Sequence, residues 1–256
     1  MLRLSNKVVI VTGSSGGIGQ ATALQFAKEG ADVVLQYRLQ ESRAREIADK
    51  IAALGRETLV FHVDFTNVNE APGEVRAMVN GTADHFGKLD VLVNLAGYPA
   101  SGEWNKHLLD LTPEDFFKPI NVDLFGTFLC AQATAPHMLK QKQGVIVNVS
   151  STPALSGHDK GLAFTVAKAG VIGLTKVLAV ALAPYVRVNA VALGNVETRW
   201  LKELTPEEVS GERERNLIRR FGSPEEIAKT ITFLSSEDSS FMNGQTVVLD
   251  GGETLH

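Results

Sequence analysis

A cluster of glycines near the N-terminus has the spacing of a loop that binds an anion. Residues 12–19 read Thr-Gly-Ser-Ser-Gly-Gly-Ile-Gly, directly after an apolar run and directly before a helical pattern. Glycines let the backbone turn tightly and approach a pyrophosphate, and the following helix points its free N–H groups and positive dipole end at the anion. A plain glycine turn is the alternative. We expect dinucleotide phosphate contacts from Gly13, Ser15, Gly17, Ile18 and Gly19.

Short apolar runs rich in Val, Ile and Leu alternate with longer helical patterns from end to end. Most of these runs lack alternating polar residues, as expected for strands covered on both faces. Repeated strand–helix units imply one α/β domain over residues 1–256, with a doubly wound parallel seven-stranded sheet and helices on both faces. We expect strands at 8–12, 33–37, 58–63, 91–95, 145–149, 187–192 and 246–249, and helices at 17–29, 40–54, 68–86, 113–140, 161–183 and 224–235.

The glycine loop resembles the Thr-Gly-x-x-x-Gly-x-Gly loop of the short-chain dehydrogenase/reductase family, and further motifs match in order along nearly the whole chain. Two motifs depart from the family pattern, with Leu95 in place of a second Asn and Leu193 in place of a Pro. The resemblance implies a Rossmann-type fold and hydride transfer between a nicotinamide cofactor and a small carbonyl or alcohol. It is nearest to 3-oxoacyl-(acyl-carrier-protein) reductases and related sugar dehydrogenases, and it leaves the substrate undecided. The further cofactor contacts that it implies are Asp64, Asn94, Ala96, Gly97, Lys168, Gly194, Val196 and Thr198.

One residue of the catalytic set implied by this resemblance has the wrong type. The family uses a tyrosine as proton donor, a lysine that holds the nicotinamide ribose and lowers the tyrosine pKa, a serine that orients the carbonyl, and an asparagine that anchors a water. Asn121, Ser151 and Lys168 match three of these positions, whereas Phe164 stands where the tyrosine is expected. Positions 164 and 168 share one helix face. A phenyl ring has no hydroxyl and therefore donates no proton.

Three interpretations of Phe164 remain open. The chain is an engineered Tyr→Phe form of an active enzyme, a natural enzyme that uses another acid such as water, His158 or Lys160, or a natural pseudoenzyme that binds a dinucleotide without turnover. We expect very low carbonyl reduction by this chain and a large recovery in Phe164→Tyr.

The residues after the second predicted strand favour NADP over NAD, although NAD stays possible. Tyr37 takes the place of the acid that binds the ribose 2′-hydroxyl in NAD enzymes, so no carboxylate repels a 2′-phosphate there. Arg38 can donate to that phosphate and stack on the adenine. The alternative for Arg38 is a solvated surface charge.

The substrate end of the site is expected in three loops. They are residues 98–107, residues 152–162 and a charged, weakly patterned segment at about 199–220, which we interpret as a flexible substrate flap or, equally, as a pair of solvated helices. Trp104 and Trp200 either line an apolar pocket or anchor their loops.

Composition excludes several other classes. The 256 residues carry a formal charge of −4 without a basic patch, which argues against nucleic-acid binding. One cysteine, Cys130, and the absence of a signal peptide or membrane span favour a reducing, cytoplasmic compartment. No spacing of metal ligands occurs, so we expect no metal. The helices at 113–140 and 161–183 are apolar nearly all round, and with the family resemblance they predict a homotetramer that charged residues at Val171 or Leu178 would dissociate.

Overall fold

A seven-stranded parallel sheet forms the centre of the computed structural model, which describes residues 2–99 and 102–255. The strand order is β3-β2-β1-β4-β5-β6-β7. All neighbouring strands pair in parallel, so the predicted fold class is confirmed. Ala100 and Ser101 of the expected substrate loop lie outside the described residues. The strands are β1 (Val8–Val11), β2 (Asp32–Tyr37), β3 (Thr58–His62), β4 (Val91–Asn94), β5 (Gly144–Ser151), β6 (Val186–Leu193) and β7 (Thr246–Leu249).

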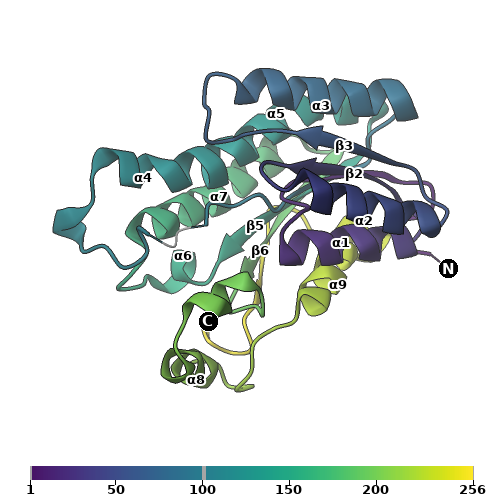
Figure 1. Cartoon of the computed structure of the whole chain (residues 1–256). Helices are drawn as coiled ribbons and strands as arrows, with labels where there is room; N and C mark the ends of the chain where they lie inside the picture. Colours follow the sequence, from purple (N-terminus) through teal and green to yellow (C-terminus); the bar gives the residue numbers. More distant parts are fainter. Residues whose placement is uncertain (1, 100–101, 256) are drawn as a thin grey trace.

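Helices cover both faces of this sheet (Figure 1). On one face α1, α2 and α9 build a core around Phe26, Ile47 and Ile231. On the other face α3, α5 and α7 build a second core around Met78 and Leu129. The helices are α1 (Gly17–Lys28), α2 (Glu41–Ala53), α3 (Ala71–Phe86), α4 (Pro113–Pro119), α5 (Gly126–Gln141), α6 (Pro153–Ser156), α7 (Leu162–Ala181), α8 (Pro206–Glu214) and α9 (Pro224–Ser235).

The central strand β1 fixes where a ligand can bind. It pairs with β2 on one side and with β4 on the other, so the chain crosses from one half of the sheet to the other between β3 and β4. The loops after β1 and β4 therefore diverge onto opposite faces. In open α/β sheets a crevice opens at this point, outside the carboxyl ends of the strands.

The helix expected at 113–140 is present, since residues 113–141 are helical without a break, but its middle is not a regular α-helix. A π-helical segment, η2 (Ile120–Phe125), separates α4 from α5. It begins directly after Pro119, which lacks the N–H of a regular helical turn. At its other end Gly126 lies against Phe65, with no room for a side chain, since an added Cβ would lie 2.8 Å from the ring. The extra residue per turn changes which side chains of this segment face the sheet.

Helix α7 has an apolar outer face as well as a buried one. Within the described residues it is the one helix that is long and apolar enough to cross a membrane by length and composition, yet it packs on β5 and β6 as a core helix. Val177 and Val180 are largely exposed, whereas Val171 is fully buried within its own chain. Leu178 also packs on the second core. Charged residues at Val171 or Leu178 would therefore disturb the fold, so the predicted interface test belongs at the exposed positions.

Two short helices form within the segment expected to be a flap. They are η3 (Arg199–Glu203) and α8, whose start carries a reciprocal cap between Thr205 and Glu208. The Nε1 of Trp200 donates to the Val196 carbonyl at 2.7 Å, and the indole packs edge-on to Phe221 with ring centroids 5.9 Å apart. Of the two roles considered for Trp200, these contacts favour anchoring its loop.

Candidate functional site

The glycine loop after β1 is closed so tightly that side chains would not fit in it. Gly13 has a φ of +64°, and an added Cβ would lie 2.8 Å from the Ala96 Cα. An added Cβ at Gly19 would collide with the Gly13 carbonyl oxygen. The loop therefore needs glycine at both positions, because of positive φ at the first and of close approach at the second.

The N-terminus of α1 is open for an anion. Its N-cap residue, Gly16, has an extended backbone, and no side chain caps the first turn. The N–H groups of such a turn lack partners within the helix, and together with the helix dipole they give the N-terminus a partial positive charge. Thr198 approaches from beyond β6, since an added Cβ on Gly17 would lie 3.2 Å from its methyl group. Empty first-turn amides beside a glycine cradle fit the pyrophosphate of a dinucleotide.

Side-chain hydrogen bonds join this loop to the neighbouring strands. Thr12 Oγ1 accepts from the backbone N–H groups of Leu95 and Ala96, both at 3.0 Å, which ties the loop after β1 to the loop after β4. The buried Gln36 Oε1 accepts from Gly13 N at 2.7 Å, and Gln36 Nε2 donates to the Val63 carbonyl at 2.8 Å. Sequence reasoning missed Gln36, because a polar residue inside an apolar strand carries no local sign of its partner.

Tyr37 ends β2, and Arg38 follows it at the same edge of the sheet. The Tyr37 ring packs edge-on to His62, with centroids 5.6 Å apart. Partial burial, and then the Glu41 carboxylate, raise the pKa of the Tyr37 phenol. Glu41 is a nearby acid that sequence reasoning missed, but Arg45 donates to its Oε1 at 2.9 and 2.6 Å. This ion pair limits the repulsion that Glu41 would exert on a phosphate.

Asp64 lies just past β3 and Asn94 is the last residue of β4, both at this edge of the sheet but with different surroundings. Asp64 Oδ1 accepts from the backbone N–H and hydroxyl of Thr66 at 2.9 and 2.6 Å. Asn94 is buried, and its Nδ2 donates to Asn148 Oδ1 at 2.9 Å. Asn148 in turn donates to Thr175 Oγ1 at 2.9 Å. The buried side chain of Asn94 therefore forms a hydrogen bond to the neighbouring strand, and a cofactor would contact Asn94 through its backbone.

The structure brings Phe164 and Lys168 together beside β5, and Ser151 is the last residue of that strand. Ser151 Oγ donates to the Leu193 carbonyl at 3.1 Å. The Lys168 Nζ lies 5.7 Å from the centroid of the Phe164 ring and donates to the Val149 carbonyl at 3.0 Å. Trp104 packs edge-on to Phe164 with centroids 5.6 Å apart. Position 164 thus has an aromatic ring and an ammonium as neighbours, and it remains partly exposed.

Asp123, rather than Asn121, is the residue of η2 that contacts Lys168. Its Oδ1 lies 2.8 Å from Lys168 Nζ, a short approach with the alignment of an ion pair rather than of a directed hydrogen bond. Its Oδ2 accepts from Tyr98 N at 2.9 Å. Asn121 is only half-buried on the same π-helical segment. Sequence reasoning missed Asp123, because the π turn that rotates it toward Lys168 has no clear sequence signal.

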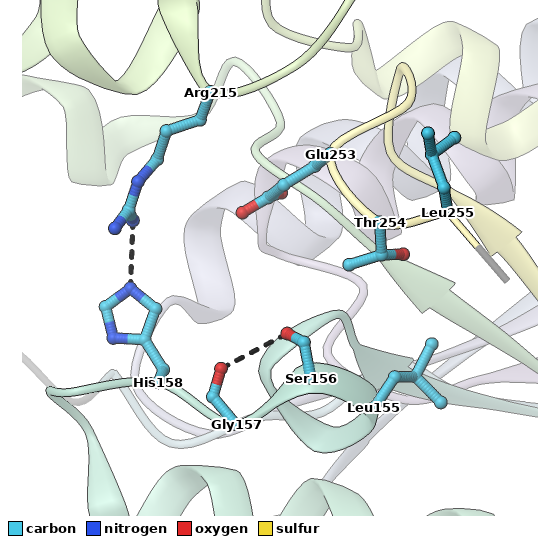
Figure 2. Close-up of a pocket in the computed structure, with 8 residues that line it drawn as sticks. All are labelled: Leu155, Ser156, Gly157, His158, Arg215, Glu253, Thr254 and Leu255. Atoms are coloured by element: carbon cyan, nitrogen blue, oxygen red, sulfur yellow. Dashed lines mark hydrogen bonds between the residues drawn. The ribbon is translucent and has the colours of Figure 1, made fainter.

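A cavity of roughly 510 Å³ opens beside this cluster, between α6, α8 and the C-terminal segment. Figure 2 shows Arg215 and Glu253 on one side of it and the loop after α6 on the other. Desolvation raises the pKa of the Glu253 carboxyl, which accepts from Thr152 Oγ1 at 3.3 Å. The residues that line the cavity are Leu155, Ser156, Gly157, His158, Arg215, Glu253, Thr254 and Leu255.

His158 reaches both the cavity and the aromatic cluster, but its ring nitrogens are engaged elsewhere. Nε2 lies 2.9 Å from Arg215 Nη1, and Nδ1 lies 3.1 Å from Asp159 Oδ1 and 3.0 Å from Lys160 N. The ring packs against Trp104, which in turn packs against Phe164. This arrangement argues against His158 as a proton donor at position 164.

Three further positions singled out in the sequence are closely packed. Val196 is buried, and an added Cβ on Gly194 would lie 2.7 Å from the Asp250 Cβ. Burial raises the pKa of the Cys130 thiol to about 12, so this residue is not a nucleophile. Across residues 2–99 and 102–255 no three His, Cys, Asp or Glu side chains converge as a metal site would require.

Comparison with known proteins places this geometry among related enzymes. Residues 13–254 match the family model described as enoyl-(acyl carrier protein) reductase. The chain is 38% identical over 253 residues to the BbsD subunit of (2S)-((R)-hydroxy(phenyl)methyl)succinyl-CoA dehydrogenase from Thauera aromatica, which covers 98% of each chain. It is also 38% identical to a 3-oxoacyl-(acyl-carrier-protein) reductase from Thermotoga maritima, over 98% of this chain and 99% of that one. A short-chain type dehydrogenase/reductase from Mycobacterium marinum superposes with a TM-score of 0.89 and 32% identity, over 100% of this chain and 98% of that one.

Proposed function

Because this chain belongs to the short-chain dehydrogenase/reductase family, we propose that it binds NADP(H) at the carboxyl edge of its sheet and reduces carbonyl substrates only very slowly. The observation that carries the slow turnover is Phe164, which stands beside Lys168 without a hydroxyl.

NADP(H), when bound, supplies or accepts the hydride. The chain must then move a proton to or from the substrate oxygen, and Phe164 cannot do so. Ser151 keeps its hydroxyl at the family's serine position, where it can orient a carbonyl. Loss of a positioned general acid commonly lowers a rate by about 10²–10⁴-fold.

The preference for NADP over NAD rests on the end of β2. Tyr37 leaves this position without a carboxylate, and Arg38 follows as a donor for a 2′-phosphate. The proposed cofactor contacts run from the loop at Gly13 and Gly19, through Asp64, to Gly97 and the other positions predicted from the sequence.

A catalytically silent dinucleotide-binding protein is the second candidate. It is favoured by the contact between Asp123 and Lys168, which occupies the cation of the catalytic cluster. The two candidates differ in turnover and agree on binding.

Parallel binding and turnover assays test the proposal. NADPH binding is followed by the change in nicotinamide fluorescence, and acetoacetyl-CoA serves as the carbonyl probe because two relatives are named for acyl thioester or acyl-carrier substrates. We expect saturable NADPH binding and a rate about 10²–10⁴-fold below that of the Thermotoga maritima relative assayed alongside. Turnover equal to that of the relative would contradict the proposed slow chemistry, and absence of NADPH binding would contradict both candidates.

We also propose a cytoplasmic homotetramer, supported by the exposed apolar residues of α7. Val177 is 64% exposed and Val180 is 81% exposed on a helix whose other face is core. Light scattering at micromolar concentration is expected to give about four times the chain mass. Val180→Glu should lower that mass, whereas Leu39→Glu, at an exposed leucine after β2, should leave it unchanged. A stable monomer would contradict this assembly.

A further inference from the structure

The buried contact between Asp123 and Lys168 is the strongest feature of the catalytic cluster that slow turnover through Phe164 alone does not explain. The Lys168 residue is 7% exposed and Asp123 is 1% exposed, with 2.8 Å between Nζ and Oδ1. A carboxylate at this distance inside a protein cancels most of the field of the ammonium, because little water screens either charge.

The surroundings of both groups hold this pair in one geometry. Tyr98 N donates to the second carboxylate oxygen of Asp123 at 2.9 Å, so this side chain is fixed from the loop after β4. Lys168 Nζ donates to the Val149 carbonyl of β5 and faces the Phe164 ring. The ammonium is therefore surrounded by a carboxylate, a carbonyl and an aromatic face of its own chain.

This environment conflicts with the task that the family resemblance gives to the lysine. A free positive charge beside a tyrosine would stabilise the phenolate and would meet the nicotinamide ribose. Paired with Asp123, Lys168 presents almost no net charge to position 164. A single Tyr→Phe replacement in an active enzyme accounts for Phe164 but not for this carboxylate.

We infer that Asp123 is a positioning residue that holds the Lys168 ammonium in a neutral buried pair, so that the site is silenced at two positions and not at Phe164 alone. This inference rests on the proposed slow chemistry. It changes the outcome expected for Phe164→Tyr from a large recovery to a partial one, because the new phenol would face an ion pair.

Ionisation of a tyrosine placed at position 164 measures this effect without any substrate. Three variants are compared: Phe164→Tyr alone, Phe164→Tyr combined with Asp123→Asn, and, as the matched control, Phe164→Tyr combined with Asp90→Asn. The absorbance of each is measured against the same protein with Phe164 retained. Asp90 is also a buried aspartate near a lysine, since Lys7 Nζ lies 3.5 Å away, but it precedes β4 at the opposite edge of the sheet. Ultraviolet absorbance of tyrosinate follows the titration. The ring of His158 packs on Trp104, which packs on position 164, and His158 is unchanged in all the variants, so it contributes equally to each titration.

With Asp123→Asn we expect the ionisation constant of the phenol introduced by Phe164→Tyr to rise by about tenfold or more, because the Lys168 charge is no longer cancelled. The rate of acetoacetyl-CoA reduction should rise by about tenfold over Phe164→Tyr alone, with its pH profile moved to lower pH. Asp90→Asn should change neither quantity.

If the phenol has the same ionisation constant in Phe164→Tyr alone and in Phe164→Tyr combined with Asp123→Asn, the inference is overturned and the proposed function stays intact. Fast turnover by the native chain would instead overturn the proposed function. If the Asn variant fails to fold, Asp123→Ser removes the same charge. Failure of both variants beside a folded Asp90→Asn protein would identify Asp123 as a purely structural residue and would also overturn the inference.

Discussion

The two ends of the candidate site differ in how closely they match the pattern of the family. The dinucleotide end, formed by the loops after β1, β2 and β3 with the start of α1, has an uncapped first helical turn and has Gly13 and Gly19 packed without room for side chains, which fits a pyrophosphate. The catalytic end, formed by Asp123, Ser151, Phe164 and Lys168, has a phenyl ring where the family pattern has a phenol and a carboxylate 2.8 Å from the Lys168 ammonium, and we propose that it has lost most of its chemistry.

This difference teaches that binding and proton transfer depend on separate parts of the same crevice. Phosphate binding needs backbone N–H groups and close approach, which belong to the fold. Proton transfer needs one hydroxyl and one unpaired charge, which two side chains can remove while the fold stays the same. A chain can therefore lose the second property without losing the first.

The largest effect is expected from filling the glycine loop. Gly19→Ala should abolish detectable NADPH binding and lower the free energy of unfolding by about 1–3 kcal/mol, because the added methyl collides with the Gly13 carbonyl. Fluorescence titration and urea unfolding measure the two quantities. Gly73→Ala is the matched control, since an added Cβ there meets open space in α3. Retained NADPH affinity in Gly19→Ala would break the comparison, because the loop would then not be the binding end.

A smaller effect, confined to one cofactor, is expected at the adenosine side. Arg38→Ala should weaken NADPH binding by about 10–100-fold, the loss of a charge-assisted contact, and NADH binding by much less. Titrations with both cofactors at fixed ionic strength test this. Arg56→Ala serves as control, because Arg56 binds the Gly30 carbonyl at the other edge of the sheet. If Arg38→Ala lowers the affinity for NADPH and for NADH equally, Arg38 is only a solvated surface charge.

The helix α9, which packs on α1 at the dinucleotide end, should lose support in acid. Hydrogen bonds from Arg220 and from the Ser223 backbone lower the pKa of Glu226 to about 2. Because this pKa is depressed on folding, the stabilisation is present above the ordinary glutamate value and is lost as the pH falls toward about 2. Glu226→Gln should cost about 0.5–1 kcal/mol at pH 7, since the pair is largely exposed, and almost nothing at pH 2. An equal cost at both pH values, measured by urea unfolding, would exclude the charge as the cause.

The smallest effect, opposite in sign, is expected at the cavity beside the catalytic end. Desolvation raises the pKa of Glu253, so its ionised form opposes folding at pH values above the ordinary glutamate value, and protonation relieves this. Glu253→Gln should therefore increase the free energy of unfolding at pH 7 by on the order of 0.5 kcal/mol, with no gain at pH 4. Urea unfolding at both pH values checks the sign. Destabilisation at pH 7 would show that the carboxylate makes a favourable contact in the cavity.

The strands and the glycine loop were predictable because their causes are local. Continuous apolar runs mark strands buried on both faces, and the limits of β7 agree with the prediction at both ends. The loop at Gly13 is fixed by its own steric needs and by the helix that follows it.

The catalytic end was less predictable because its decisive contacts join distant segments. Asp123 meets Lys168 only through the π turn of η2, which a helical periodicity over 113–140 does not reveal. Gln36 supports Gly13 from inside an apolar strand for a reason that is visible only in the fold. The absence of a hydroxyl at Phe164 was plain in the sequence, whereas the carboxylate beside Lys168 became visible only in the structure.

The π-helical segment also sets a rule for insertions and deletions in this part of the chain. Each residue of a regular helix turns the backbone by about 100°, so removing one residue from η2 would rotate α4 by that angle relative to α5. Asp123 would leave Lys168, and the Tyr98 backbone would lose its acceptor, although every other side chain were unchanged. Among homologues of this chain, insertions and deletions in this segment should therefore be rarer than substitutions at its exposed residues.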